Sequence, residues 1–380
     1  MNGPALVFVG VAVVSMYQPD VETGQTVVVE GDRITYAGPA SGATIPRDAR
    51  RIDGRGRYLM PGLADMHVHL HFADELGVYL AHGITTVRNM RGGPEHLAWR
   101  EEVRSGRRPG PNVLTSGPTL GGSPLRNPAF TAVDSPADGR RVVAEQASAG
   151  YDFVKVHSRI RPDVYAAIAE TARARDIRVV GHYLPEVGLD AQVRERQASL
   201  EHVSDIAAVL TDALARRMAA TRTFVAPLLC TDYTGEAPAT DLPGLLARPK
   251  QAWREPSERD RRAVSMLLSA GVPLLAGTDA SLPAMRPGES LGLEMRSLAA
   301  AGLTPRGVLA AVTRNAGQFI PPRQGHWPDF GTIRSGARAD LLLLDANPLE
   351  DPLRALSPRS VVASGRLYET SDLARLRGTR

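Results

Sequence analysis

Two histidines at alternate positions of an apolar segment form the pattern with the clearest chemical meaning in this sequence. His67 and His69 belong to the segment Asp65-Met66-His67-Val68-His69. Side chains alternate between the two faces of a strand, so both imidazoles point to one face if this segment is extended. Two imidazoles on one face can bind one cation together, although the pattern also fits two polar residues at the end of a strand.

Four further polar residues stand in or directly after later apolar segments: Lys155, His182, His202 and Asp279. Burying such a group without a partner costs free energy, which favours one shared site over four independent positions. Lys155 is informative because Lys250 is the only other lysine, and every other basic residue of the Lys/Arg type is arginine. We therefore predict one polar site that combines these four residues with His67 and His69.

The apolar segments alternate with helical patterns through the middle of the chain. Strands are expected at residues 62–69, 85–89, 112–116, 153–157, 178–182, 199–203, 223–228 and 273–278, with helices between them, for example at 162–175, 205–220 and 259–270. Eight strand–helix units predict a (β/α)8 TIM barrel, at whose mouth the six polar residues would converge. An open doubly wound sheet fits less well, because no glycine-rich phosphate loop follows any strand.

Both ends of the chain are rich in short strands. These are expected at residues 6–15, 27–30, 33–37 and 50–53, and again at 331–333, 340–344, 360–363 and 366–368, with a frayed helix at 371–380. Neither set has enough strands to bury a face alone. We predict that residues 1–60 and 326–380 form one small β-sandwich domain beside a barrel of residues 61–325.

The order of the polar residues resembles that of the amidohydrolase superfamily: His-x-His on the first barrel strand, Lys on the fourth, His on the fifth and sixth, and Asp on the eighth. The resemblance extends to Pro61-Gly62-Leu63-Ala64-Asp65, Gly83-Ile84-Thr85-Thr86-Val87-Arg88 and Gly336-Ala337-Arg338-Ala339-Asp340-Leu341. These segments are similar to the imidazolonepropionase-like branch, which includes the Xaa-Pro dipeptidases (prolidases). The resemblance covers nearly the whole chain.

The resemblance implies a site with two divalent metal ions, commonly zinc. His67, His69 and Asp279 would bind the first metal, His182 and His202 the second, and Lys155, carboxylated by carbon dioxide, would bind both. An arginine could not be converted into such a carbamate ligand. In this mechanism a metal-bridging hydroxide attacks the substrate, and Asp279 carries its proton to the leaving group.

The sequence departs from the prolidase pattern in two places. Gly121-Gly122-Ser123-Pro124 lacks the histidine that helps those relatives recognise substrate, and Arg88-Asn89 stands where they carry Arg-Asp. Substrate contacts are expected from His157, Tyr183 and Tyr233, with core packing as the alternative for the first two. The long segments 119–130 and 230–256 follow barrel strands and are expected to shape the pocket.

We therefore expect a hydrolase that cleaves an amide bond, most simply in an Xaa-Pro dipeptide or an N-acyl amino acid. Hydrolysis of carboxylic esters, lactones or organophosphate triesters at the same site is the alternative. A one-metal deaminase fits less well, because those relatives generally lack the bridging lysine. A non-catalytic scaffold would require lost ligands, whereas all six positions are filled.

The composition narrows the classes of partner. The 45 Lys and Arg residues are mixed along the chain with 41 Asp and Glu residues, without the basic stripe of a nucleic-acid-binding protein. The one cysteine, Cys230, excludes a disulfide framework and is expected to pack. No apolar run reaches the length of a membrane span. We expect a cytoplasmic enzyme with a small-molecule substrate and neither a nucleic-acid nor a membrane partner; the sequence leaves a homo-oligomer open.

Overall fold

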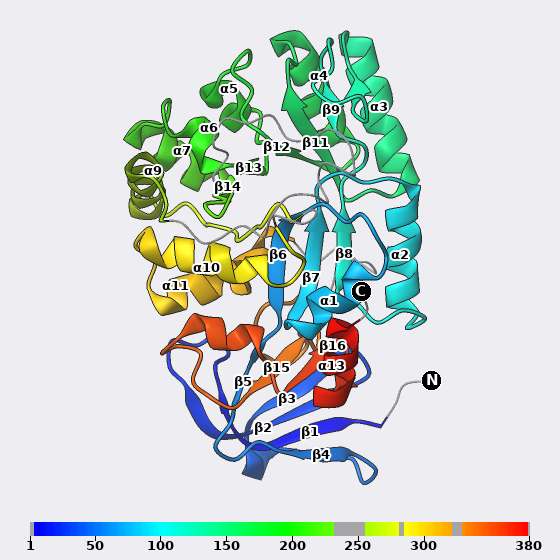
Figure 1. The fold of residues 1–380 in the computed structure, drawn as a ribbon, viewed down its shortest axis with the longest axis vertical. Coiled ribbons are helices and arrows are strands. Elements are labelled where there is room, and N and C mark those ends of the chain that lie inside the picture. Colours follow the sequence, from blue (N-terminus) through cyan, green and yellow to red (C-terminus); the bar gives the residue numbers. More distant parts are fainter. Residues whose placement is uncertain (1–3, 232–254, 281–284, 321–328, 379–380) are drawn as a thin grey trace.

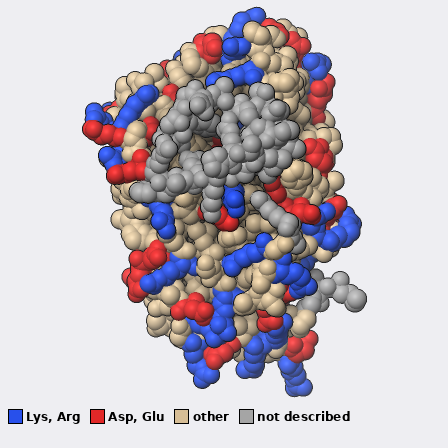
Figure 2. Space-filling view, viewed as in Figure 1, with Lys and Arg blue, Asp and Glu red and all other residues tan. Residues whose placement is uncertain are grey.

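The computed structural model describes residues 4–231, 255–280, 285–320 and 329–378. Figure 1 shows a larger part of mixed helices and strands above a smaller part rich in strands, where segments from both ends of the chain lie together. Acidic and basic side chains are interspersed over the face of the molecule shown in Figure 2. No helix among the described residues is long and apolar enough to cross a membrane.

Eight parallel segments form a ring in the larger part. They are β6 (Leu63–Val68), β7 (Ile84–Asn89), β8 (Asn112–Thr115), β11 (Phe153–Ser158), β12 (Arg178–Gly181), β13 (Ser199–Glu201), β14 (Phe224–Ala226) and residues 274–280. Ladders join β6 to β8 and β11 to β14 in chain order. Single bridges complete the ring by pairing Ser116 with Phe153, Val225 with Leu274 and Val68 with Ala280. This is the arrangement of the predicted (β/α)8 barrel.

Helices follow the barrel strands and cover them on the outside (Figure 1). They are α1 (Glu75–Ala81), α2 (Pro94–Arg104), α3 (Pro136–Ala149), α4 (Pro162–Ala174), α5 (Leu189–Arg194), α6 (Val203–Ile206), α7 (Asp212–Thr221), α9 (Glu258–Ser269), α10 (Ser290–Ala300), α11 (Pro305–Ala311) and α12 (Arg314–Phe319). The prediction of one helix over residues 205–220 is wrong. The chain leaves the helical conformation at Thr211, whose side chain accepts a hydrogen bond from Leu214 N and starts α7.

The segment after β8 contains structure of its own. Two short strands, β9 (Leu120–Gly121) and β10 (Thr131–Ala132), pair in parallel, and β9 also pairs with β11. Ser123 donates hydrogen bonds from its backbone N–H (2.8 Å) and its hydroxyl (2.6 Å) to the carboxylate of Asp134. Residues 119–130 are therefore held against the end of β11. Most of the second long segment, 230–256, lies outside the described residues.

Strands from both ends of the chain form one sheet. In spatial order they are β17 (Arg366–Tyr368), β16 (Ser360–Ala363), β15 (Leu341–Leu344), β5 (Tyr58–Pro61), β1 (Leu6–Val13), β2 (Glu22–Glu30) and β3 (Arg33–Pro39), with β4 (Arg50–Asp53) also paired to β1. Short 3-10 turns occupy Ala40–Gly42 and Pro352–Leu356. Phe8, Val27 and Leu343 are buried in a hydrophobic cluster that belongs to this sheet. The division of the chain at residues 60 and 326 stays a prediction.

Two terminal segments differ from the expectation. Residues 331–333 form no strand, although Ile333 N donates to Ser15 O at 2.9 Å. The tail is not frayed: α13 (Thr370–Arg377) packs beside α1, with Leu373 buried and Arg377 donating to Ala81 O at 2.9 Å. Leu373 and Leu376, three positions apart, provide the apolar face of this helix. The arginines around them make this apolar face hard to recognise in the sequence.

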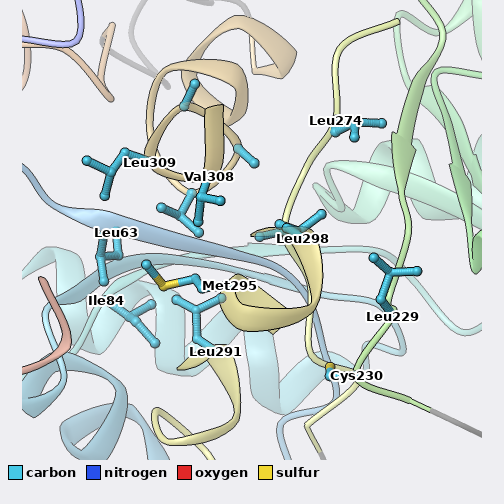
Figure 3. Close-up of a cluster of buried hydrophobic side chains, with 14 of the residues drawn as sticks. Leu63, Ile84, Leu229, Cys230, Leu274, Leu291, Met295, Leu298, Val308 and Leu309 are labelled. Carbon is cyan, nitrogen blue, oxygen red and sulfur yellow. The ribbon is translucent and has the colours of Figure 1, made fainter. Parts of the chain in front are cut away.

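The largest hydrophobic cluster joins the first two barrel strands to α10 and α11. Figure 3 shows Leu63 and Ile84 beside Met295 of α10 and Val308 of α11. Leu298 of α10 is fully buried within the same cluster. Burial of these side chains ties the helices after the eighth barrel segment to the strands at the start of the barrel.

Replacing Leu298 by alanine should lower the free energy of unfolding by about 2–5 kcal/mol, because the side chain leaves a cavity in a packed core. Urea denaturation followed by circular dichroism measures this loss. Leu268→Ala on α9 is the matched control, since Leu268 is 38% exposed. An equal loss for the two variants would contradict the assignment of Leu298 to the core.

Candidate active site

The six predicted site residues come together at the carboxyl end of the barrel. His67 lies in β6 and Lys155 in β11, whereas His69, His182 and His202 each follow directly after β6, β12 and β13. Asp279 lies in the eighth segment, next to Ala280, which pairs with Val68. Parallel barrel strands end at the same rim, so residues far apart in the sequence meet there.

His67, His69 and Asp279 form the tightest part of this group. Asp279 Oδ1 lies 3.0 Å from His69 Nε2 and 3.5 Å from His67 Nε2. One nitrogen from each imidazole and one oxygen from the carboxylate lie within 4.8 Å of one another. Two imidazole nitrogens and a carboxylate oxygen are a common donor set for zinc and similar divalent cations.

The remaining three residues continue from this group. Lys155 Nζ lies 3.2 Å from His67 Nε2. The ring centre of His202 lies 5.3 Å from that of His67 and 4.7 Å from that of His182. Side-chain contacts thus connect all six residues: Lys155 lies beside His67, and His202 lies between His67 and His182.

A buried charge network orients His67, and the sequence patterns do not identify its members as site residues. Glu201 Oε2 lies 3.0 Å from His67 Nδ1 and 2.9 Å from Arg88 Nη2, and all three side chains are fully buried. Ser199 Oγ donates to Glu201 Oε1 at 2.5 Å. The carboxylate holds Nδ1, so Nε2 of His67 faces the site. The available signal is a glutamate inside a short buried strand opposite a buried arginine.

His182 has a comparable partner. Its Nδ1 lies 3.0 Å from Asp205 Oδ2, and Asp205 belongs to α6, which begins directly after His202. A carboxylate beside one ring nitrogen fixes the orientation of the imidazole and favours the other nitrogen as a ligand. Asp205 is thus a second residue of the site that the sequence patterns do not single out.

Hydrogen bonds to Asp65 join β6, which carries His67, to the eighth barrel segment. Thr278 donates to the Asp65 carboxylate from its backbone N–H (3.1 Å) and from its hydroxyl (2.7 Å). The carbonyl oxygen of His67 accepts from the backbone N–H groups of Thr278 (3.1 Å) and Asp279 (2.7 Å). These bonds set Asp279 directly beside the two histidines.

Two of the candidate ligands have a left-handed backbone conformation. The φ angles are 61° at His202 and 53° at Asp279. Such values are uncommon for residues with a side chain and cost roughly 1–3 kcal/mol each, so the surrounding structure must hold them. Both residues stand at the carboxyl ends of barrel segments, where the strain accompanies the other features of the candidate site.

Burial controls the protonation of the site. It lowers the pKa of His67 to about 4, with the Lys155 charge acting in the same direction, and lowers the pKa of His69 and His182 well below the ordinary value. Burial also lowers the pKa of Lys155 to about 8. Burial opposes ionisation of Asp279, but the hydrogen bond and charge of His69 outweigh it and hold the pKa of Asp279 well below its usual range.

The residues predicted to contact the substrate, and Cys230, differ in their position relative to the six candidate ligands. The His157 ring lies 4.1 Å from the His182 ring and 4.8 Å from the Phe130 ring, which places it beside the group. Tyr183 is half-buried and packs against the main hydrophobic cluster. Tyr233 lies outside the described residues. Cys230 is buried, and burial raises the pKa of its thiol well above the ordinary value, as expected for a packing residue.

The residues present fit a divalent metal. Neutral imidazoles are the form that binds a cation, and the lowered pKa values favour it. The carboxylates of Glu201 and Asp205 orient two of the rings from behind. His69 Nδ1 is buried and makes no hydrogen bond with the described residues, so the ring is directed into the site by packing and by Asp279 alone.

The chain belongs to the amidohydrolase family, whose model matches residues 58–367. This match confirms the family predicted from the motifs, and with it a hydrolase that acts on carbon–nitrogen bonds with the help of divalent metal ions. The matched residues include every barrel strand and the part of the terminal sheet from β5 to β17.

Several characterised relatives are similar over most of the chain. Ochratoxinase of Aspergillus niger is 25% identical in an alignment that covers 82% of this chain and 75% of ochratoxinase. The solved structure of phenylurea hydrolase B has a TM-score of 0.80 and 19% identity, covering 99% of this chain and 100% of its own. A Xaa-Pro dipeptidase with methionine in its active site has a TM-score of 0.78 and 18% identity, covering 96% and 100%. These structures confirm the fold class.

Glu201→Gln should strongly destabilise the protein, because it leaves the Arg88 guanidinium buried without a counterion. Breaking a buried pair from one side costs about 3–5 kcal/mol. Chemical denaturation of the metal-free protein measures this loss independently of any activity. Glu145→Gln is the matched control: Glu145 forms an exposed ion pair with Arg141 on α3 and should leave the denaturation midpoint nearly unchanged. A loss no larger than the control would contradict the proposed dependence of Arg88 on Glu201.

Proposed function

We propose that this protein hydrolyses an amide bond at a site with two divalent metal ions, in an Xaa-Pro dipeptide or an N-acyl amino acid. The observation that carries the proposal is the position of Lys155, which is buried with its Nζ 3.2 Å from His67 Nε2. A lysine in this position is a costly choice unless its amine is converted into something that binds the neighbouring groups.

The metals, proposed to be zinc, would be held by the chain's own side chains in two sets. His67, His69 and Asp279 would hold one ion, and His182 with His202 the other. Lys155 would reach both as a carbamate formed with carbon dioxide. The lowered pKa of Lys155 supports this step, because a neutral amine is the form that reacts. Bound divalent cations would lower the pKa of water and polarise the amide carbonyl.

Asp279 would move the proton in the reaction. Its carboxylate stays ionised and lies beside both histidines of the pair, so it can accept a proton from the attacking water. Passing this proton to the nitrogen of the departing amine completes the cleavage. His157 is proposed to contact the substrate, because it borders the group from the side of Phe130. Tyr183 and Tyr233 are proposed as further contacts.

The similar proteins support an amide substrate without defining it. One of the solved structures with the same fold is that of a Xaa-Pro dipeptidase, and the family acts on carbon–nitrogen bonds. The recognition histidine of prolidases is absent from Gly121-Gly122-Ser123-Pro124, so a broader choice of N-acyl amino acids is proposed alongside Xaa-Pro dipeptides.

The substrate class is tested with metal-loaded protein and a panel of Xaa-Pro dipeptides, N-acyl amino acids, carboxylic esters, lactones and organophosphate triesters. We expect turnover of one of the first two classes, with about two metal ions per chain by elemental analysis. Turnover of only esters, lactones or triesters would contradict the amide proposal. One metal ion per chain, with deamination of a heterocycle, would contradict the two-metal site.

Replacing Lys155 by alanine should abolish turnover and reduce the metal content towards one ion per chain, and short carboxylic acids should restore part of both. Lys155→Arg should lose the same metal and show no rescue, because a guanidinium cannot become a ligand. Carbon-13 NMR of protein equilibrated with labelled bicarbonate should show a carbamate signal that both variants lack. A Lys155→Arg protein with two metal ions per chain and normal turnover would contradict the proposal that Lys155 forms a carbamate.

A further inference from the structure

We propose that Arg91 binds an anionic group of the substrate, a carboxylate, at the rim of the candidate active site. This inference rests on the proposed amide hydrolysis at the same site and narrows its substrates to those that carry a negative charge next to the cleaved bond.

The backbone at Arg91 is held rigidly beside the histidine pair. Met90 N donates to Val68 O at 2.8 Å, so the turn after β7 lies directly against the residue that precedes His69. The side-chain amide of Asn89 donates to Arg91 O at 3.1 Å. Gly92 has no room for a side chain, because an added Cβ would lie 1.9 Å from Ser116 O. The turn therefore presents Arg91 from a fixed position at the barrel mouth.

The guanidinium of Arg91 is not hydrogen-bonded or ion-paired to another described residue. It is half-buried, yet it makes neither a hydrogen bond nor an ion pair with any residue that the structure describes. The buried arginines elsewhere in the barrel and sheet are paired: Arg88 with Glu201 at 2.9 Å and Arg338 with Asp340 at 2.5 Å. A partly desolvated guanidinium that forms no hydrogen bond with a carboxylate keeps its N–H donors available for an anionic ligand.

The charge around Arg91 favours an incoming anion. Its electrostatic effect reaches His69, Lys155 and Asp279, so it borders the candidate metal ligands. The negative charge of Asp279 acts on Arg91, but the Asp279 carboxylate is engaged by His69 at 3.0 Å. Divalent cations bound at the site would add further positive charge beside Arg91. The substrate is then the remaining source of an anion for this guanidinium.

A carboxylate is the anion that the proposed substrates would bring to this position. A guanidinium presents two parallel N–H groups that fit both oxygens of a carboxylate. Dipeptides and N-acyl amino acids carry a carboxylate one carbon away from the nitrogen of the cleaved amide. Binding this carboxylate at the rim would fix the distance between the scissile carbonyl and the metal ligands, which a neutral substrate could not use.

The inference is tested with two compounds that differ only in charge, N-acetyl-L-phenylalanine and N-acetyl-L-phenylalaninamide. We expect wild-type protein to prefer the first, and Arg91→Gln to raise its KM about 10- to 100-fold, the range for loss of a charge-assisted hydrogen bond. The effect should fall on KM rather than kcat, so that the preference for the carboxylate disappears. Arg91→Lys should restore the preference only in part.

Arg126→Gln is the matched control. Arg126 is an exposed arginine of the segment after β8, and its charge acts on His157 and Asp205 rather than on Asp279. The control should keep the wild-type preference. Loss of the preference in Arg126→Gln but not in Arg91→Gln would overturn the assignment, as would an equal effect of Arg91→Gln on both compounds.

Calorimetric binding of the same two compounds separates this inference from the proposed reaction. If neither compound is cleaved but the carboxylate binds more tightly and Arg91→Gln removes the difference, the anion site stands and the amide reaction fails for these compounds. If both compounds are cleaved or bound equally by the wild-type protein, the anion site is wrong whatever the reaction proves to be.

Discussion

The junction between the first and the last barrel strand is the constraint on which the rest of the site depends. The bond from Thr278 to Asp65 spans 213 positions of sequence and lies next to three candidate ligands. Gly277 contributes to the same junction, because a Cβ there would lie 2.6 Å from the Cβ of His67. The strands approach so closely that only glycine fits, and this approach brings the Asp279 carboxylate within reach of both imidazoles.

Buried charges give the site its rigidity at a thermodynamic cost. Arg88 is removed entirely from water and rests against the rings of Phe153 and Phe319, with Glu201 as its counterion. Hydrophobic residues of equal size could make a stable core in this place. They could not hold the Nδ1 atom of His67, so the position of the ring would depend on packing alone. The buried pair is best understood as serving orientation rather than stability.

The positions of the strands and of the ligands follow from local patterns, whereas their supports do not. Several barrel strands are short runs followed by a polar residue, and that signal is sufficient to locate His182, His202 and Asp279. Glu201 and Asp205 are common acidic residues, and only the three-dimensional structure brings them to the ring nitrogens. The sequence does not reveal the break between α6 and α7, because the capping residue Thr211 resembles any polar residue within a helix. Arg91 is equally inconspicuous in a chain this rich in arginine.

The terminal sheet has a consequence for the order in which the protein can assemble. β5 lies between β1 and β15, and β15 is made only after the whole barrel has been synthesised. Until then one edge of β5 and the apolar faces of β1 and β2 have no partner from the second half of the chain. Open strand edges of this kind promote association with other chains. The first sixty residues therefore remain open to association with other chains until β15 is available to cover the edge of β5.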